Sequence, residues 1–165
     1  MATGAEGVMA VDAEGEAVKD PLALESQVCF ALSLASRSVI AAYRPALEPL
    51  HLTHPQYLVM LALWERAPLS VKGLSGLLHL EPATLSPLIK RLEALGYVLR
   101  TRDSADERSL AIVLTDEGAA LRAEAEKIPA AMMRRLRMDE QELTALHASM
   151  MKLITVALED EVPGG

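Results

Sequence analysis

Two short amphipathic segments near the middle of the chain, separated by only about three residues, place the strongest constraint on its fold. Ser70 suits the start of the first segment, residues 71–78, and Pro82 suits the start of the second, which ends at Gly96. Both repeat apolar residues at three- and four-residue steps, so both are predicted to be helices with one buried side. Two helices joined by so short a turn indicate a helix-turn-helix.

The second of these helices would present a small, polar and basic face to solvent. Its predicted buried stripe comprises Leu85, Leu88, Ile89, Leu92 and Leu95. The residues left on the outer face and its flanks are Ala83, Thr84, Ser86, Lys90 and Arg91. This combination matches the recognition helix of a DNA-binding helix-turn-helix.

A β-hairpin with a basic loop is predicted directly after this helix. Residues 97–102 alternate apolar with basic or polar side chains, and residues 108–114 contain a second alternating set. Three arginines flank the polar loop between them, and these are Arg100, Arg102 and Arg108. A wing that grips the DNA backbone or minor groove requires such a loop.

Amphipathic helices are predicted on both sides of this central part. They cover residues 21–47, 54–67, 115–128 and 139–159, and Pro129 bends or ends the third. The last helix carries an apolar stripe that needs a partner, so the terminal helices are the expected dimer interface. The predicted fold class is mainly α with a small β-hairpin wing, a winged helix-turn-helix whose dimer is built from N- and C-terminal helices.

The predicted domain organisation follows from these elements. Residues 1–20 lack helical apolar spacing and are expected to be a disordered tail, followed by a single domain over residues 21–165. Within that domain, residues 54–114 form the DNA-binding lobe. Residues 21–50 and 116–160 supply the dimerisation helices.

The distribution of charge permits DNA binding although the 165-residue chain carries a formal net charge of −7. The net charge is −5 over residues 1–30 and −4 over residues 111–165, but +1 over each of the stretches 31–70 and 71–110. The excess of acidic residues therefore lies at the two ends. DNA affinity is expected to depend strongly on salt.

Several other classes of protein are disfavoured. No apolar run is long enough to span a bilayer and the N-terminus lacks signal-peptide features, which predicts a cytoplasmic protein with no membrane partner. Cys29 is the single cysteine and cannot form an internal disulfide. No nucleophile elbow or Gly-rich phosphate loop is present, so neither an enzyme nor a cofactor is predicted. The histidines His51, His79 and His147 lack the spacing of metal ligands, so no metal site is predicted.

Three stretches of sequence carry a resemblance to a known family. They are residues 24–32 with Cys29-Phe30, residues 43–65 with Tyr43-Arg-Pro, Pro55-Gln-Tyr and Trp64-Glu65, and residues 84–92 followed by Asp106-Glu-Arg-Ser109. They resemble the MarR family of bacterial winged-helix regulators, and within it the one-cysteine type of organic hydroperoxide resistance regulator (OhrR). The third stretch is typical of MarR proteins generally, whereas the first two are more specific to OhrR.

The resemblance implies a dimeric repressor that binds a pseudopalindromic operator in double-stranded DNA. Its two recognition helices would enter successive major grooves, about one helical turn apart, while the wings reach the flanking minor grooves. Arg108 would enter the minor groove, held by Asp106, while Ser70 and Lys72 would touch the backbone. The remaining predicted DNA-binding residues are Ala83, Thr84, Ser86, Pro87, Lys90, Arg91, Arg100 and Arg102.

The resemblance also implies a redox sensor. OhrR proteins use a cysteine near the start of the first helix as a peroxide-reactive thiolate, and Cys29 occupies that position. Tyr43 matches a tyrosine that donates to the thiolate from the other subunit, whereas Ser33 and His54 stand where two further tyrosines are usual. Oxidation by an organic hydroperoxide would give a sulfenic acid, which a low-molecular-weight thiol traps or which is oxidised further, and DNA is then released.

Two alternatives remain open. A noncovalent aromatic or lipophilic effector would bind in the crevice between the dimer helices and the DNA-binding lobe, and Cys29 would then be structural. The departures at Ser33 and His54 favour this alternative. A thiol peroxidase is the other, but the chain has no resolving cysteine.

Overall fold

A computed structural model describes residues 20–102 and 110–159. The chain divides between Val39 and Ile40 into two compact units, and each is described by itself. The predicted division into a tail and a single domain from residue 21 stays a prediction. No helix in the described part of the chain is both long and apolar enough to cross a bilayer.

The first unit contains a short 3-10 helix, η1 (Leu24–Ser26), and the start of helix α1 (Val28–Leu47). The helix predicted from residue 21 therefore begins later, because Gln27 has extended backbone angles. The Gln27 side-chain amide donates to the carbonyl of Pro21 over 2.6 Å, which closes a local turn ahead of α1. The sequence pattern did not reveal this side-chain bond.

Three helices of the second unit match the sequence prediction closely. They follow η2 (Glu48–Leu50), and they are α2 (His54–Arg66), α3 (Val71–Leu78) and α4 (Pro82–Ala94). Thr53 forms a reciprocal capping box with Gln56 at the start of α2, and Ser70 Oγ accepts from the amide of Gly73 over 3.0 Å. The predicted caps are confirmed because each satisfies a helix amide that lacks an internal partner.

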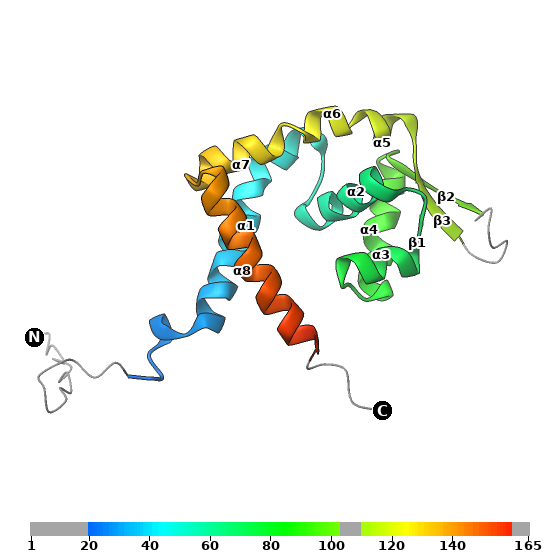
Figure 1. The fold of residues 1–165 in the computed structure, drawn as a ribbon. Coiled ribbons are helices and arrows are strands. Elements are labelled where there is room, and N and C mark those ends of the chain that lie inside the picture. Colours follow the sequence, from blue (N-terminus) through cyan, green and yellow to red (C-terminus); the bar gives the residue numbers. More distant parts are fainter. Residues whose placement is uncertain (1–19, 103–109, 160–165) are drawn as a thin grey trace, which may run out of the picture. The chain divides into compact units, whose positions relative to one another are not determined.

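The wing belongs to a three-stranded antiparallel sheet, of order β1-β3-β2. Its strands are β1 (Leu69–Ser70), β2 (Val98–Arg102) and β3 (Leu110–Leu114). Strands β2 and β3 confirm the predicted hairpin, whereas β1 was not predicted, since two residues cannot show alternation. Figure 1 shows these strands beside α2, α3 and α4.

One hydrophobic core joins the helices and the sheet of this unit. Its fully buried side chains are Leu47, Val59, Met60, Leu63, Leu74, Leu85, Ile89, Leu92, Val98 and Ile112. Helix α4 contributes its predicted stripe, because Leu85, Ile89 and Leu92 are all fully buried. The opposite face of α4 is thereby held toward solvent.

The C-terminal part differs from the predicted helix over residues 115–128. It is divided into α5 (Asp116–Ala120), α6 (Arg122–Ala125) and α7 (Ile128–Leu136), followed by α8 (Glu140–Glu159). Pro129 stands in the first turn of α7, where a missing amide costs nothing, and this helix was not predicted. Helix α8 has no buried residue, and its exposed large apolar side chains are Leu146, Met151, Leu153, Ile154, Val156 and Leu158.

Gly118 joins the end of the hairpin to α2. Its carbonyl accepts a hydrogen bond from Trp64 Nε1 over 2.8 Å, and its amide donates to Thr115 Oγ1 over 2.9 Å. A Cβ atom at this position would lie 1.9 Å from the carbonyl oxygen of Tyr97. The tight backbone contact therefore requires glycine.

Substitution of Gly118 by alanine is expected to lower the free energy of unfolding by about 3 kcal/mol, because backbone atoms must move to admit the methyl group. Gly76→Ala in α3 is the matched control, since no atom lies within 4 Å of its Cβ position. That change should stabilise the chain by about 0.5–1 kcal/mol through its helix propensity. Urea unfolding of both variants would check this, and equal stabilities would refute it.

Candidate nucleic-acid interface and redox residues

Helix α4 presents its predicted recognition face to solvent. The predicted DNA-facing residues of this helix are all exposed, namely Ala83, Thr84, Ser86, Pro87, Lys90 and Arg91. Small residues at its first turn allow close approach to another surface, and the two cations follow in the next turns. The arrangement suits insertion into a groove lined by phosphates.

Both ends of α4 are fixed by neighbouring elements. Pro82 opens the helix, and Gly96 ends it with a φ of 79°, in the left-handed region. The Tyr97 hydroxyl then donates to the carbonyl of Leu50 over 3.1 Å, which ties the chain after α4 to the chain before α2. The exposed face of α4 is therefore held on a rigid support.

Four cations on α3, α4 and β2 form no ion pair with any described residue. They are Lys72, Lys90, Arg91 and Arg102, and all are exposed. Arg100 differs, because its Nε lies 3.2 Å from Glu93 Oε2 and so links β2 to α4. Ser70 is half-buried and caps α3, so its hydroxyl serves the helix first. The predicted contacts of Asp106 and Arg108 lie outside the described residues.

The predicted redox residues fall into two pairs, one in each compact unit. Cys29 is exposed in the first turn of α1, and Ser33, also exposed, follows one turn later on the same face. In the other unit, the Tyr43 and His54 rings meet edge to face, with centroids 5.2 Å apart. Tyr57 extends this cluster, its centroid 6.0 Å from that of Tyr43.

Burial sets the protonation chemistry of the aromatic cluster. It lowers the pKa of His54 below the ordinary 6.5, because charging the ring would cost solvation. Burial raises the pKa of the Tyr57 hydroxyl, and the neighbouring Tyr43 adds to the rise. A neutral imidazole and neutral phenols can each donate one hydrogen bond.

Comparison with known proteins decides the family. The sequence profile of the MarR family matches residues 52–110. The organic hydroperoxide resistance transcriptional regulator of Bacillus subtilis is 38% identical over 135 residues, which cover 82% of this chain and 92% of that protein. The chain belongs to the MarR family. It is a MarR-type transcriptional regulator that binds DNA, as members of this family do.

Other MarR regulators match over shorter or similar lengths. The transcriptional regulator TtmR of Methylorubrum extorquens is 49% identical over 67% of this chain, but the match spans only 56% of TtmR. The crystal structure of AbfR from Staphylococcus epidermidis is 33% identical, with a TM-score of 0.67 over 84% of this chain and 95% of AbfR. CouR of Rhodococcus jostii is 28% identical, with a TM-score of 0.69 over 81% and 94%. The predicted winged-helix fold is confirmed.

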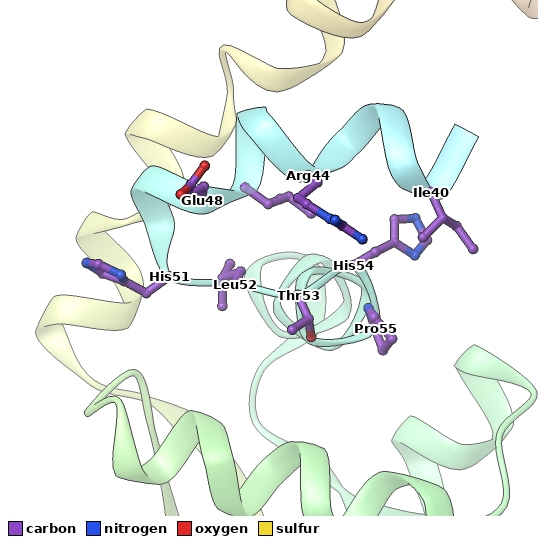
Figure 2. A pocket seen from close by; sticks show the side chains of 9 residues that line it. Ile40, Arg44, Glu48, His51, Leu52, Thr53, His54 and Pro55 are labelled. Atoms are coloured by element: carbon purple, nitrogen blue, oxygen red, sulfur yellow. The ribbon is translucent and has the colours of Figure 1, made fainter. Parts of the chain in front are cut away.

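This MarR protein also contains a cavity of about 600 Å³ between the end of α1 and the start of α2. Figure 2 shows Arg44 on α1 extending toward His54, with Ile40 on α1 beside that ring and Glu48 at the start of η2. The lining combines apolar side chains with the Arg44 guanidinium, the Glu48 carboxylate and the imidazoles of His51 and His54. A cavity with apolar walls and a few polar groups suits a small organic molecule.

Two residues of the interface and the cavity escaped the sequence analysis. Glu93 was not singled out although it pairs with Arg100, because its partner lies on a strand seven residues away. Arg44 belongs to the Tyr43-Arg-Pro stretch, but its place beside His54 depends on how η2 returns the chain. Pairs that form across a turn leave no periodic pattern in sequence.

The His54 environment predicts a pH dependence of stability. As the pH falls, His54 takes up a proton near its ordinary pKa of 6.5 in the unfolded chain, but only at a lower pH in the folded chain. The free energy of unfolding should therefore fall as the pH drops below about 6.5. His54→Gln should flatten this slope. Urea unfolding of both proteins between about pH 5 and 8 measures it. The same slope in the wild type and the variant would contradict the prediction.

Proposed function

We propose that this MarR regulator is a cytoplasmic repressor that senses organic hydroperoxides through Cys29 and then releases its operator. The observation that carries the proposal is the exposure of the single cysteine in the first turn of α1, where a peroxide can reach it. The Bacillus subtilis relative is named for organic hydroperoxide resistance. Structures of AbfR include reduced and overoxidised forms bound to DNA and a disulfide form.

The first chemical step needs only the thiolate and the peroxide, and the second needs a small thiol. The sulfur electron pair attacks the terminal peroxide oxygen, the O–O bond breaks, and the leaving alkoxide takes a proton to become an alcohol. The resulting sulfenic acid then condenses with a low-molecular-weight thiol, forming a mixed disulfide and water. Tyr43 is proposed to stabilise the thiolate by donating a hydrogen bond from the other subunit, with His54 and Ser33 as further donors.

DNA binding is proposed to use a homodimer. The exposed apolar residues of α8 supply a surface that a second copy would cover, together with α1. The α4 helices would then enter successive major grooves, with Lys72 and Arg100 near the backbone and Arg102 at the wing. An adduct on Cys29 adds bulk and polarity near the dimer helices, and a change in their spacing would misplace both recognition helices.

The cavity favours a second candidate function. Arg44 and His54 beside apolar walls suit an aromatic or lipophilic carboxylate, which would act as a noncovalent effector. CouR has been solved with p-coumaroyl-CoA bound and also with a DNA duplex. In this alternative Cys29 is structural and DNA release requires no oxidation.

One titration separates the candidates. The reduced protein is bound to DNA from its own upstream region, and one equivalent of cumene hydroperoxide or an excess of benzoate is added. Release by the peroxide, with one oxidation of Cys29 per chain and no further turnover, supports the redox repressor. Release by benzoate alone supports the second candidate, and continuous peroxide consumption would indicate a peroxidase instead.

A further inference from the structure

Pro87 is an unexpected residue in the recognition helix. Helix α4 runs without interruption from Pro82 to Ala94, and Pro87 lies beyond its first turn. Proline is the least favourable residue at such a position, because it removes a hydrogen bond and crowds the preceding turn. Pro87 is exposed, so burial in the core does not offset this cost. A costly residue at an exposed position of a binding helix indicates a functional reason.

The proline changes the hydrogen bonding of one backbone group. In a regular α-helix the carbonyl of Ala83 accepts from the amide of residue 87, and proline has no amide hydrogen to donate. Ala83 and Pro87 lie one turn apart on the same exposed face. The adjacent carbonyl of Pro82 is served differently, since Ser86 Oγ donates to it over 2.9 Å. The outer face of α4 therefore carries one carbonyl, that of Ala83, which lacks its usual helix donor.

We propose that the Ala83 carbonyl reads one base pair of each operator half-site by accepting a hydrogen bond from an exocyclic amino group. This inference rests on the proposed position of α4 in the major groove. There the amino groups of cytosine (N4) and adenine (N6) are the only base donors. Neither Lys90 nor Arg91 can recognise them, because both side chains only donate. A base without an amino group would leave the desolvated carbonyl unpaired, so it would be rejected.

The test compares operator preferences of the full-length reduced protein with those of Pro87→Ala. Each protein selects sites from a random duplex library. The wild type is expected to prefer cytosine or adenine about fivefold at one position per half-site, and the variant should reduce this to about twofold while its other preferences persist. The preferred base identifies which amine is read. Replacing it with an analogue that lacks the amino group should weaken wild-type binding about fivefold and binding of the variant by no more than about twofold.

Several results would overturn the proposal. An unchanged preference profile, or a uniform loss at every position, would show that the carbonyl reads no base. The position whose preference is lost in Pro87→Ala could instead be a thymine. If replacing that thymine with deoxyuridine removes the wild-type preference, Pro87 contacts the thymine methyl group. Thr84→Ala and Lys90→Ala in the same selection distinguish failure of this inference from failure of the proposed position of α4 on DNA. If they alter binding and Pro87→Ala does not, only this inference fails, whereas no effect from any variant removes α4 from the interface.

The unfolding temperature of Pro87→Ala gives a second test. A functional role and a structural role of Pro87 predict changes in opposite directions. Pro87→Ala restores a helix hydrogen bond and removes a steric conflict, so it should raise the unfolding temperature. A lower unfolding temperature would show that Pro87 stabilises the fold, and the functional explanation for its cost would be lost.

Discussion

Replacement of Cys29 by serine is expected to abolish release of DNA by organic hydroperoxides while leaving DNA binding intact. In the wild type, one equivalent of cumene hydroperoxide in the presence of a small thiol should weaken operator binding about 10- to 100-fold, the usual range for coupling between two sites. Serine has nearly the same size but no oxidisable sulfur. Because Cys29 is exposed, the substitution should change the free energy of unfolding by less than about 0.5 kcal/mol.

The variant also separates cysteine oxidation from methionine oxidation. The chain has eight methionines, and Met151 is exposed, so peroxide could reach a thioether instead. Operator binding is followed by fluorescence anisotropy, and mass spectrometry locates the added oxygen or thiol. Release of Cys29→Ser by peroxide would refute the redox mechanism. Retained binding by both proteins would make Cys29 structural and direct attention to the cavity beside Arg44.

The DNA-binding part could be predicted from sequence because its signals are local. The caps at Thr53 and Ser70 each involve residues three positions apart, and the buried stripe of α4 repeats along one helix. The sequence alternation that predicted the hairpin is equally local, although burial along β2 and β3 does not alternate. The same argument explains why β1 was missed, since this strand is defined only by its pairing with β3.

The C-terminal helices were harder to predict for a different reason. Pro129 can end a helix or begin one, and the sequence alone gives both outcomes similar support. The structure uses it at the start of α7, which lengthens the helical region up to Leu136. The need for glycine at position 118 was also hidden, because the clash involves the distant backbone of Tyr97.

The candidate site likewise has features that local sequence predicts and features that it does not. Exposure of Thr84, Lys90 and Arg91 follows from helix periodicity and is confirmed by the structure. The pairing of Arg100 with Glu93 depends on tertiary geometry and could not be predicted. That pairing suggests that Arg100 positions the wing against α4 as well as supplying positive charge.

Removal of two cations from α4 is expected to cause the second large effect, a weaker and less salt-dependent interaction with DNA. Each phosphate contact releases about 0.9 counterion, which contributes roughly fivefold to affinity near 0.15 M salt. Lys90→Ala/Arg91→Ala removes four cations from a dimer. If all four contact phosphates, affinity should fall several hundredfold, and the slope of log affinity against log salt should decrease by about 3.6.

A matched variant controls for the change in net charge. Lys127→Ala/Arg134→Ala removes the same charge from exposed positions near and within α7, away from the recognition helix. In a protein that is already acidic, general repulsion of DNA should affect both variants alike, whereas direct contacts should affect only the α4 variant. Titrations at several salt concentrations measure the two slopes. Equal losses would mean that the overall field, rather than α4, holds the DNA, and the recognition helix would have to be sought elsewhere on the lobe.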